Sequence, residues 1–245
     1  MVDTGIASSH PDIKGKVVGQ RDFVNNDPYA KDDNGHSTHA AGIAAGATNN
    51  TQGVAGTCPN CTLLGAKVLD ADGTDYMDHI AQGITWSANS GARVISLSLS
   101  DPSTTALYNA VNYAWDKGAV MIAAAGNEST SSVSYNYPDA YGNAIAVAAT
   151  DAYDRRAYYS NYGSWVDVAA PGTSIMSTLG WYGAKSGTSM ATPHVAGLAG
   201  LLFGQGRSRD QVRYRIERTA TDLGAPGRDV YYGYGRINAA NAVAR

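Results

Sequence analysis

Along this chain, short apolar runs alternate with segments in which apolar residues recur at helical spacing. Residues 62–69, 93–98 and 119–125 are rich in apolar and small side chains, as buried strands are. Residues 76–90 and 104–117 instead carry an apolar residue every three or four positions, which predicts two helices. Strands that alternate with helices in this way are joined by crossover connections, which predicts a parallel sheet covered on both faces.

The rest of the pattern fits the same architecture. We predict an α/β fold of three layers, in which a mostly parallel central sheet is flanked by helices. No change of composition and no internal repeat divides the chain, so residues 1–245 are predicted to form a single domain. The remaining predicted elements are strands at 144–149 and 165–169 and helices at 40–47, 191–203, 209–219 and 238–244.

Composition excludes several classes of protein. The chain is 44% hydrophobic with a formal net charge of −3, which is typical of a globular protein and not of a nucleic-acid binder. No run of 18 apolar residues predicts a membrane span. Only Glu128 and Glu217 are glutamates, whereas the other acids are aspartates, which suit turns, helix caps and oxygen-rich metal sites.

The two cysteines, Cys58 and Cys61, belong to a Cys-Pro-Asn-Cys segment. Their spacing fits a thioredoxin-like redox pair, but such a pair begins a helix, and this one precedes a predicted strand. The pair would also fit half of a zinc site, but the sequence holds no second cysteine pair. The sequence therefore favours a local disulfide or two inert thiols.

Four polar residues lie where predicted strands end or predicted helices begin. Asp3 and Asn127 follow apolar residues, and His36 and Ser189 precede small-residue and apolar helices. Polar residues at strand ends gather at one edge of a parallel sheet. Each residue alone is an ordinary turn or cap residue. Together, an Asp, a His and a Ser in this order are the components of a nucleophilic triad.

The segments that carry these residues resemble the subtilisin-like serine proteases (subtilases) of the thermitase type, and the resemblance runs along essentially the whole chain. It implies a serine endopeptidase that works through an acyl-enzyme intermediate. Ser189 would be the nucleophile, His36 the general base, Asp3 the group that orients His36, and Asn127 the side chain of the oxyanion hole. The similar segments are Val2-Asp3-Thr4-Gly5-Ile6, His10-Pro11-Asp12, His36-Ser37-Thr38-His39, Ala124-Ala125-Gly126-Asn127 and Gly187-Thr188-Ser189-Met190-Ala191-Thr192-Pro193-His194.

The same resemblance implies how a polypeptide substrate is bound. The substrate would lie extended between two backbone edges of the protein and pair with them by strand addition. Glu128, at the rim of the pocket for the P1 side chain, would extend an apolar preference toward Lys or Arg. The residues implied are Gly73, Thr74 and Asp75 for one edge, Ser98, Leu99 and Ser100 for the other, and Ala125, Gly126, Glu128 and Asn136 for the pocket.

Calcium is the cofactor that the resemblance implies, in a structural role, and no catalytic cofactor is expected. Calcium takes six to eight oxygen ligands. The first site would use the side chains of Asp12 and Asn50 and the carbonyls of Thr48, Gln52 and Val54, although residues 48–54 also fit a plain Asn/Gly turn. A second cation site would combine Asp151 with the carbonyls of Asp139, Tyr141 and Ala144.

The sequence also departs from the family. A longer segment, with one calcium ligand, precedes the catalytic Asp in the family, so this chain is predicted to be truncated at its N-terminus, less stable, and weaker in calcium binding. Ser37, Asp75, Ser100 and Asp101 stand where the family has glycine. Side chains at these positions are expected to strain the backbone or to narrow the substrate edges.

Other functions remain open from the sequence. The resemblance implies a secreted monomer that acts on polypeptides, without a membrane or nucleic-acid partner, although no signal peptide is present in this chain. The alternative is an inactive or weakly active subtilisin-like fold that serves as a binding module. An esterase is a third reading, but the Gly-x-Ser-x-Gly elbow is absent because Ala191 stands at its last position.

Overall fold

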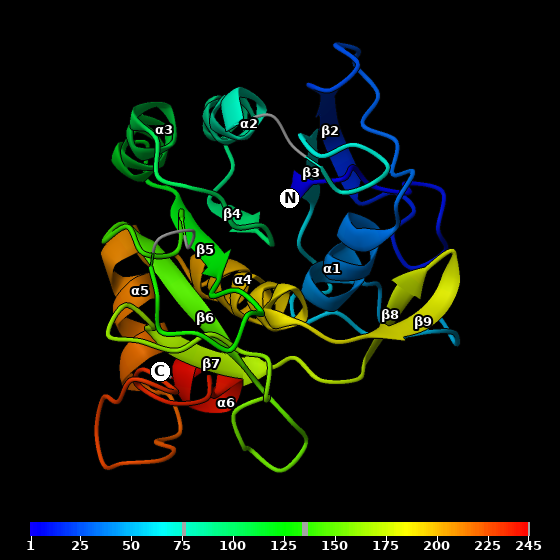
Figure 1. The fold of residues 1–245 in the computed structure, drawn as a ribbon. Coiled ribbons are helices and arrows are strands. Elements are labelled where there is room, and N and C mark those ends of the chain that lie inside the picture. The colour runs from blue at the N-terminus through cyan, green and yellow to red at the C-terminus, as the bar shows by residue number, and fades with distance from the viewer. Residues whose placement is uncertain (75–76, 134–136, 245) are drawn as a thin grey trace.

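A seven-stranded sheet forms the centre of the molecule in a computed structural model that describes residues 1–74, 77–133 and 137–244 (Figure 1). The strand order is β2-β3-β1-β4-β5-β6-β7, and neighbouring strands are parallel throughout. The predicted α/β fold is therefore confirmed. The strands are β1 (Val2–Asp3), β2 (Val17–Asp22), β3 (Leu63–Lys67), β4 (Val94–Leu97), β5 (Val120–Ala124), β6 (Ala144–Thr150) and β7 (Val168–Pro171).

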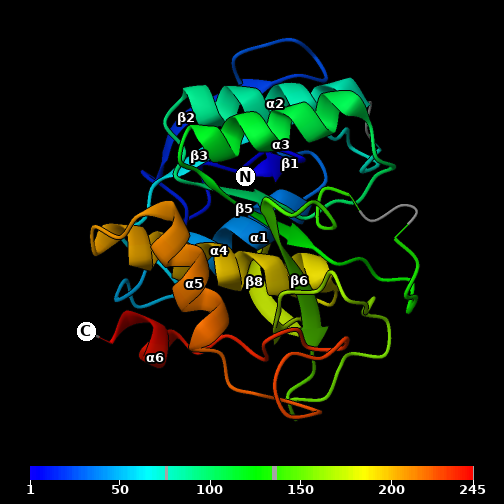
Figure 2. The ribbon, with the colours of Figure 1, turned by 90° about the vertical axis from the view of Figure 1, so that its left-hand side faces the viewer.

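Helices cover both faces of this sheet, which gives the three predicted layers (Figure 2). On one face, α2 (Met77–Asn89) and α3 (Thr105–Asp116) lie side by side. On the other face, α1 (His36–Ala45) packs against the long helix α4 (Thr188–Gly204). Behind α4 lie α5 (Arg209–Arg218) and α6 (Ala239–Val243). Within the described ranges, no helix has the length and apolar character needed to cross a bilayer.

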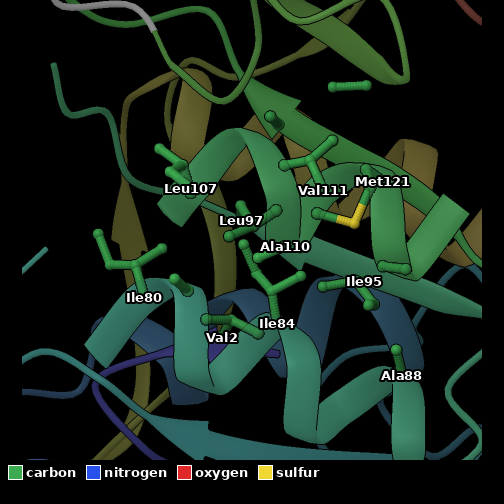
Figure 3. Packing of buried hydrophobic residues seen from close by; sticks show 14 of the residues in the cluster. Val2, Ile80, Ile84, Ala88, Ile95, Leu97, Leu107, Ala110, Val111 and Met121 are labelled. Carbon is green, nitrogen blue, oxygen red and sulfur yellow. The ribbon is translucent and has the colours of Figure 1, made fainter. Parts of the chain in front are cut away.

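The core explains why apolar runs predicted the strands. Val2 of β1 and Leu97 of β4 are fully buried against Ile84 of α2 and Val111 of α3 (Figure 3). A second apolar cluster fills the space between the opposite face of the sheet and α4. Strands buried on both faces need apolar residues at successive positions, so the sequence shows runs and no alternation.

Small residues let α1 and α4 approach closely. A side chain at Gly197 of α4 would collide with Thr57 and with the carbonyl of Ala44. Glycine is therefore needed at this position, because only a hydrogen fits between the two backbones. The close contact fixes α1 relative to α4, and these helices begin with the segments that carry His36 and Ser189.

The apolar pattern did not predict β2 or the hairpin of β8 (Ile175–Leu179) and β9 (Trp181–Lys185). It predicted a strand at 165–169, whereas β7 begins and ends a few residues later, at Val168–Pro171. β2 and β9 are only partly buried, so their residues are mixed in polarity. The hairpin packs on α1, where Thr178 Oγ1 donates to the Thr38 carbonyl at 2.6 Å.

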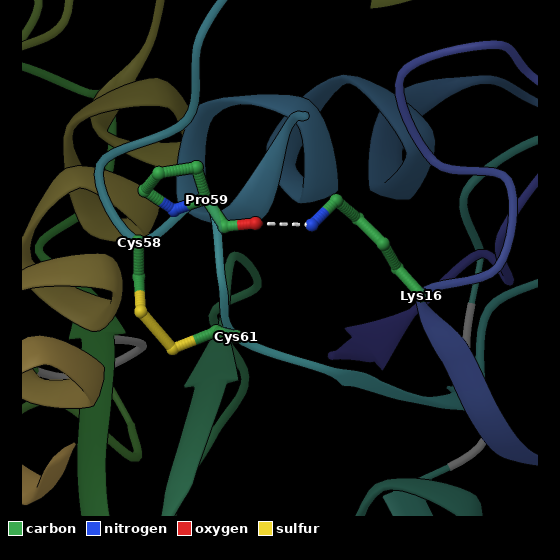
Figure 4. The surroundings of a disulfide bond; sticks show 4 residues. All are labelled: Lys16, Cys58, Pro59 and Cys61. Carbon is green, nitrogen blue, oxygen red and sulfur yellow. Dashed lines mark hydrogen bonds between the residues drawn. A yellow bond between two sulfur atoms is a disulfide. The ribbon is translucent and has the colours of Figure 1, made fainter. Parts of the chain in front are cut away.

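Cys58 and Cys61 form the local disulfide that the sequence favoured (Figure 4). The bonded turn follows α1, and the Cys58 N–H donates to the Ala44 carbonyl at 2.8 Å. The Lys16 ammonium donates to the carbonyl of Pro59 inside the turn. The disulfide therefore closes a turn in the connection between α1 and β3.

Replacing both cysteines by alanine should destabilise the fold modestly. A closed loop this short restricts the unfolded chain little, so the expected loss is about 2 kcal/mol, or roughly 4–8 °C in Tm. Thermal unfolding of the double variant and of the wild type with reductant measures this loss. An unchanged Tm in both samples would show that the disulfide does not contribute to stability.

Candidate active site

Four elements bring the predicted triad and oxyanion residues to one edge of the sheet. Asp3 ends β1, which lies in the middle of the sheet between β3 and β4. His36 is the first residue of α1, and Ser189 is the second residue of α4. Asn127 follows β5 after a two-residue turn. The strand order reverses at β1, because β2 and β3 lie on one side of it and β4 to β7 lie on the other. In open parallel sheets, ligands bind at such a topological switch point.

The Asp3 carboxylate holds the His36 ring through both of its oxygens. His36 Nδ1 lies 2.8 Å from Oδ1 and 3.0 Å from Oδ2, and the carboxylate is 1% exposed. The Thr4 N–H also donates to Oδ1 at 2.7 Å, which orients the carboxylate. The negative charge of Asp3 raises the pKa of His36 above its ordinary value, against the opposing effects of burial and of the Lys185 ammonium. Nδ1 therefore carries a proton, and Nε2 is the basic nitrogen of the neutral ring.

Ser189 lies in the first turn of α4, where backbone N–H groups have no acceptor within the helix. Its hydroxyl donates to the Ser98 carbonyl at 3.3 Å, and Ser98 Oγ donates back to the Ser189 carbonyl at 3.1 Å. These two bonds join the end of β4 to the start of α4.

The Asn127 side chain is oriented by the residue that precedes Ser189. Asn127 Oδ1 accepts the Thr188 N–H at 2.9 Å and lies 3.1 Å from Thr188 Oγ1. Since Oδ1 is engaged, Nδ2 is the group that can donate to a substrate. Asn127 Nδ2 and the N–H of Ser189 are then two donors on either side of the start of α4.

Glu128 and Asn161 support the turn that carries Asn127. Glu128 Oε2 accepts the Asn127 N–H at 2.9 Å and Asn161 Nδ2 at 2.6 Å. Gly126 lies above this pair with φ of 95°, and a side chain there would collide with Asn161. Glycine is therefore required at position 126, and Glu128 lies at an exposed position beside the oxyanion residues.

The two predicted substrate edges differ in how much of each the structure describes. Ser98, Leu99 and Ser100 follow β4 directly and become more exposed along the chain. Gly73 and Thr74 are exposed in a turn whose amides bond to Asp70. Ala125 is buried beneath the turn that leads to Asn127. The predictions for Asp75 and Asn136 lie outside the described residues.

One supporting residue near the triad escaped the sequence analysis. The Asp32 carboxylate accepts hydrogen bonds from Thr4 Oγ1 and from the N–H groups of Gly35 and Thr38. Burial opposes ionisation of Asp32, but these hydrogen bonds outweigh burial and lower its pKa. An Asp shortly before a helix is a signal for an N-terminal cap, and this signal could have identified Asp32.

The residues of the first predicted calcium site lie together. Asp12 is fully buried, and its carboxylate accepts from Asn50 Nδ2 at 2.6 Å, from the Val54 N–H at 3.1 Å and from the Tyr182 hydroxyl at 3.0 Å. Residues 47–55 surround a hollow of about 400 Å³. Asn49 and Thr51 have positive φ values of 59° and 62°, which are strained for side-chain-bearing residues. A buried carboxylate with only neutral donors, next to a strained loop of carbonyls, fits a calcium ion.

The second predicted cation site is wrong in one ligand. Asp139, Tyr141 and Ala144 line one hollow, but Asp151 follows the far end of β6, roughly 20 Å from Ala144 at strand rise. The Asp151 carboxylate instead pairs with Arg155 at 2.7 Å. The four residues therefore cannot hold one ion. Among the described residues, no three or more His, Cys, Asp or Glu side chains form a metal-binding group.

Comparison with known proteins agrees with this geometry. Residues 1–235 match the family model described as the subtilase family. Thermitase from Thermoactinomyces vulgaris is 53% identical over 246 aligned positions, which cover 99% of this chain and 87% of that protein. A thermophilic serine proteinase from Bacillus sp. (strain AK1) is 52% identical, with 99% of this chain and 60% of that protein covered.

Solved structures match over the same range. The structure of sphericase superimposes with a TM-score of 0.89 at 35% identity and covers 96% of this chain and 89% of that chain. The structure of a cold adapted subtilisin-like serine proteinase superimposes with a TM-score of 0.85 at 33% identity and covers 97% of this chain and 85% of that chain. The Asp3–His36 pair at the edge of the sheet and the serine in the first turn of α4 are thus accompanied by similarity along nearly the whole chain. The chain belongs to the subtilase family and is a serine endopeptidase.

Proposed function

We propose that Asp3, His36, Ser189 and Asn127 carry out peptide-bond hydrolysis in this chain. His36 Nε2 takes the proton of Ser189 Oγ as the oxygen attacks the substrate carbonyl, and then gives that proton to the leaving amine. The Asp3 carboxylate, 2.8 and 3.0 Å from Nδ1, keeps the ring in position and stabilises the imidazolium form. The observation that carries this proposal is the two-oxygen contact of Asp3 with the His36 ring. It is supported by the packing of α1, which begins with His36, against α4, which carries Ser189 in its first turn.

The developing oxyanion is stabilised by two donors. Asn127 Nδ2 and the Ser189 N–H supply hydrogen bonds where negative charge appears, and loss of such a side-chain donor lowers kcat roughly 10²–10³-fold. Lys185 ends β9, four residues before Ser189. Its positive charge offsets part of the rise in the pKa of His36 that Asp3 causes. Its charge favours the neutral imidazole that accepts the serine proton.

We further propose that the chain is a single domain which acts as a secreted monomer on polypeptides. Substrate backbone pairs with Gly73 and Thr74 on one side and with Ser98–Ser100 on the other, by strand addition. Ala125 and Gly126 line the pocket for the P1 side chain, and Glu128 adds negative charge at its rim. Calcium binds in the loop at 48–54, held by Asp12, Asn50 and the carbonyls of Thr48, Gln52 and Val54, and supplies positive charge that rigidifies the loop.

Covalent labelling tests the assignment of the nucleophile. A fluorophosphonate probe is expected to label the wild type at Ser189, and neither Ser189→Ala nor His36→Ala should react. Ser90→Ala is a matched control, because it removes the hydroxyl of an exposed serine that follows α2 and leaves the site unchanged. Labelling that persists in Ser189→Ala would contradict the assignment of Ser189 as the nucleophile.

The pH dependence of activity tests the role of Asp3. The neutral His36 ring is the active base, so kcat/KM should rise with pH through the pKa of His36, which lies above the ordinary 6.5. Asp3→Asn removes the charge that raises this pKa, so the rise should move to lower pH while kcat falls roughly 10⁴-fold. The exposed Asp78→Asn serves as the control. A rise at the same pH in Asp3→Asn would contradict the assignment.

Glu128→Gln tests the rim charge. The amide keeps the acceptor for the Asn127 N–H but removes the negative charge, so kcat/KM for Lys and Arg at P1 should fall about 2–5-fold relative to Phe. Paired peptides that differ only at P1 provide the measurement. Equal ratios of Lys to Phe turnover in both proteins would exclude a role of Glu128 in selecting basic residues.

Calcium should stabilise the fold through the loop at 48–54. A ligand at 100 times its Kd adds about 2.7 kcal/mol, so Tm should rise roughly 5–10 °C between EDTA and saturating calcium. Asp12→Asn should lose this response, whereas Asp151→Asn, at an aspartate that pairs with Arg155, should keep it. The same Tm in EDTA and in calcium would contradict the site.

A further inference from the structure

The turn at residues 126–130, which carries Asn127, is bonded to a second segment of the chain at residues 159–162. Three backbone hydrogen bonds of 2.8–3.1 Å link the two segments, from the N–H groups of Asn161, Ser129 and Tyr162 to the carbonyls of Gly126, Tyr159 and Thr130 in that order. The second segment contains none of the triad residues. The turn is thus held by a part of the chain that takes no direct part in the chemistry.

The side chain of Asn161 fills the inside of this turn and is fully buried. Its Oδ1 accepts the N–H groups of Glu128 and Thr130, both at 3.0 Å. Its Nδ2 donates at 2.6 Å to Glu128 Oε2, the same oxygen that accepts the Asn127 N–H at 2.9 Å. One amide side chain therefore satisfies two backbone donors of the turn and orients the carboxylate that binds a third.

A separate pair of bonds attaches the turn to α4. The Gly126 N–H donates to Thr188 Oγ1 at 3.1 Å, and Asn127 Oδ1 accepts the Thr188 N–H at 2.9 Å. Thr188 thus fixes the oxygen end of the Asn127 amide, whereas Asn161 and Glu128 fix the backbone from which that amide extends. The position of Asn127 Nδ2 depends on both attachments.

Hydrogen bonds have to supply this rigidity, because packing does not. Asn127, Glu128 and Ser129 are all exposed, as residues of mobile surface turns are. An oxyanion hole nevertheless needs its donors at about 2.7–3.1 Å from the developing charge. A displacement of about 1 Å can lower the rate of such a site roughly 10²-fold.

We propose that Asn161 is a positioning residue for the oxyanion hole, which acts on Asn127 through Glu128 and through the backbone of the turn. This inference rests on the proposed role of Asn127 as an oxyanion donor. The donor is needed in the transition state more than in the bound substrate, so loss of Asn161 lowers kcat and changes KM little.

Asn161→Leu tests this proposal, because leucine has a similar size and shape but no hydrogen-bonding group. For a peptide with Phe at P1, kcat should fall roughly 10–100-fold, while KM should change less than about 3-fold. Asn238→Ala is the matched control. Asn238 caps α6 by accepting the Asn241 N–H at 3.0 Å, so its loss should lower Tm and leave kcat unchanged.

A double variant shows whether Asn161 acts through Asn127. Asn127→Ala alone should lower kcat roughly 10²–10³-fold. Adding Asn161→Leu to Asn127→Ala should lower kcat by less than about a further 2-fold, because the donor that Asn161 positions is already gone. Two effects that multiply in the double variant would overturn the proposal.

Two variants of the exposed Glu128 test the same link without a change in the core. Glu128→Gln keeps an oxygen that can accept from Asn161 Nδ2 and from the Asn127 N–H, so kcat for Phe at P1 should stay within about 2-fold of the wild type. Glu128→Ala removes that oxygen and should lower kcat roughly 5–10-fold. If Asn161→Leu does not fold, this pair decides, and equal kcat values in the two variants count against the inference.

The outcomes separate this inference from the proposed function. An unchanged kcat in Asn127→Ala would contradict the oxyanion assignment, and the inference with it. A low kcat in Asn127→Ala together with a wild-type kcat in a folded Asn161→Leu would overturn the inference alone. A loss of kcat/KM in Asn161→Leu that comes entirely from KM would also overturn it.

Discussion

A buried ammonium in the middle of the sheet holds the acid of the triad in place. Lys67, at the end of β3, is 1% exposed, and burying a charged amine is costly unless every donor is satisfied. Its three protons go to the Thr4 carbonyl at 3.0 Å, the Leu69 carbonyl at 2.8 Å and Asp33 Oδ1 at 2.6 Å. These acceptors follow β1, follow β3 and precede α1. The distance between Asp3 and His36 therefore depends on one charged group that touches neither.

Short hydrogen-bonded links from this point connect the remaining parts of the site. Asp32, next to Asp33, binds Thr4 and the first amides of α1, so the helix that carries His36 begins at a fixed position relative to β1. The hydroxyl of Ser98 joins β4 to Ser189 in the same way, and Asn127 is bonded to Thr188. The geometry of the site is thus set by strand ends, while the helices contribute their unpaired amides.

The apolar pattern of the sequence predicted most of the strands and helices. The features that it did not predict depend on contacts between residues that are far apart in the sequence. The buried strands β4, β5 and β6 were found because burial on both faces leaves an apolar run in the sequence. The hairpin of β8 and β9 was not found, because its exposed positions interrupt the pattern. The ion-pair partners of Lys67 and of Asp167 are more than 30 residues away in the sequence, and no local signal marks them.

Charge balance distinguishes the places where this fold needs a metal ion from those where it does not. Lys67 has Asp33 as its counter-charge, and Asp167 has Arg213 and Arg228. The carboxylate of Asp12 is buried completely, yet its partners are an amide, a backbone N–H and a phenol, all of them neutral. A buried carboxylate without positive charge is destabilising, and neutral donors offset only part of that cost. Within the part of the chain that the structure describes, two arginines pair with Asp167 and no cationic side chain pairs with Asp12, and this difference is the physical basis for proposing a bound ion at Asp12 and the loop at 48–54.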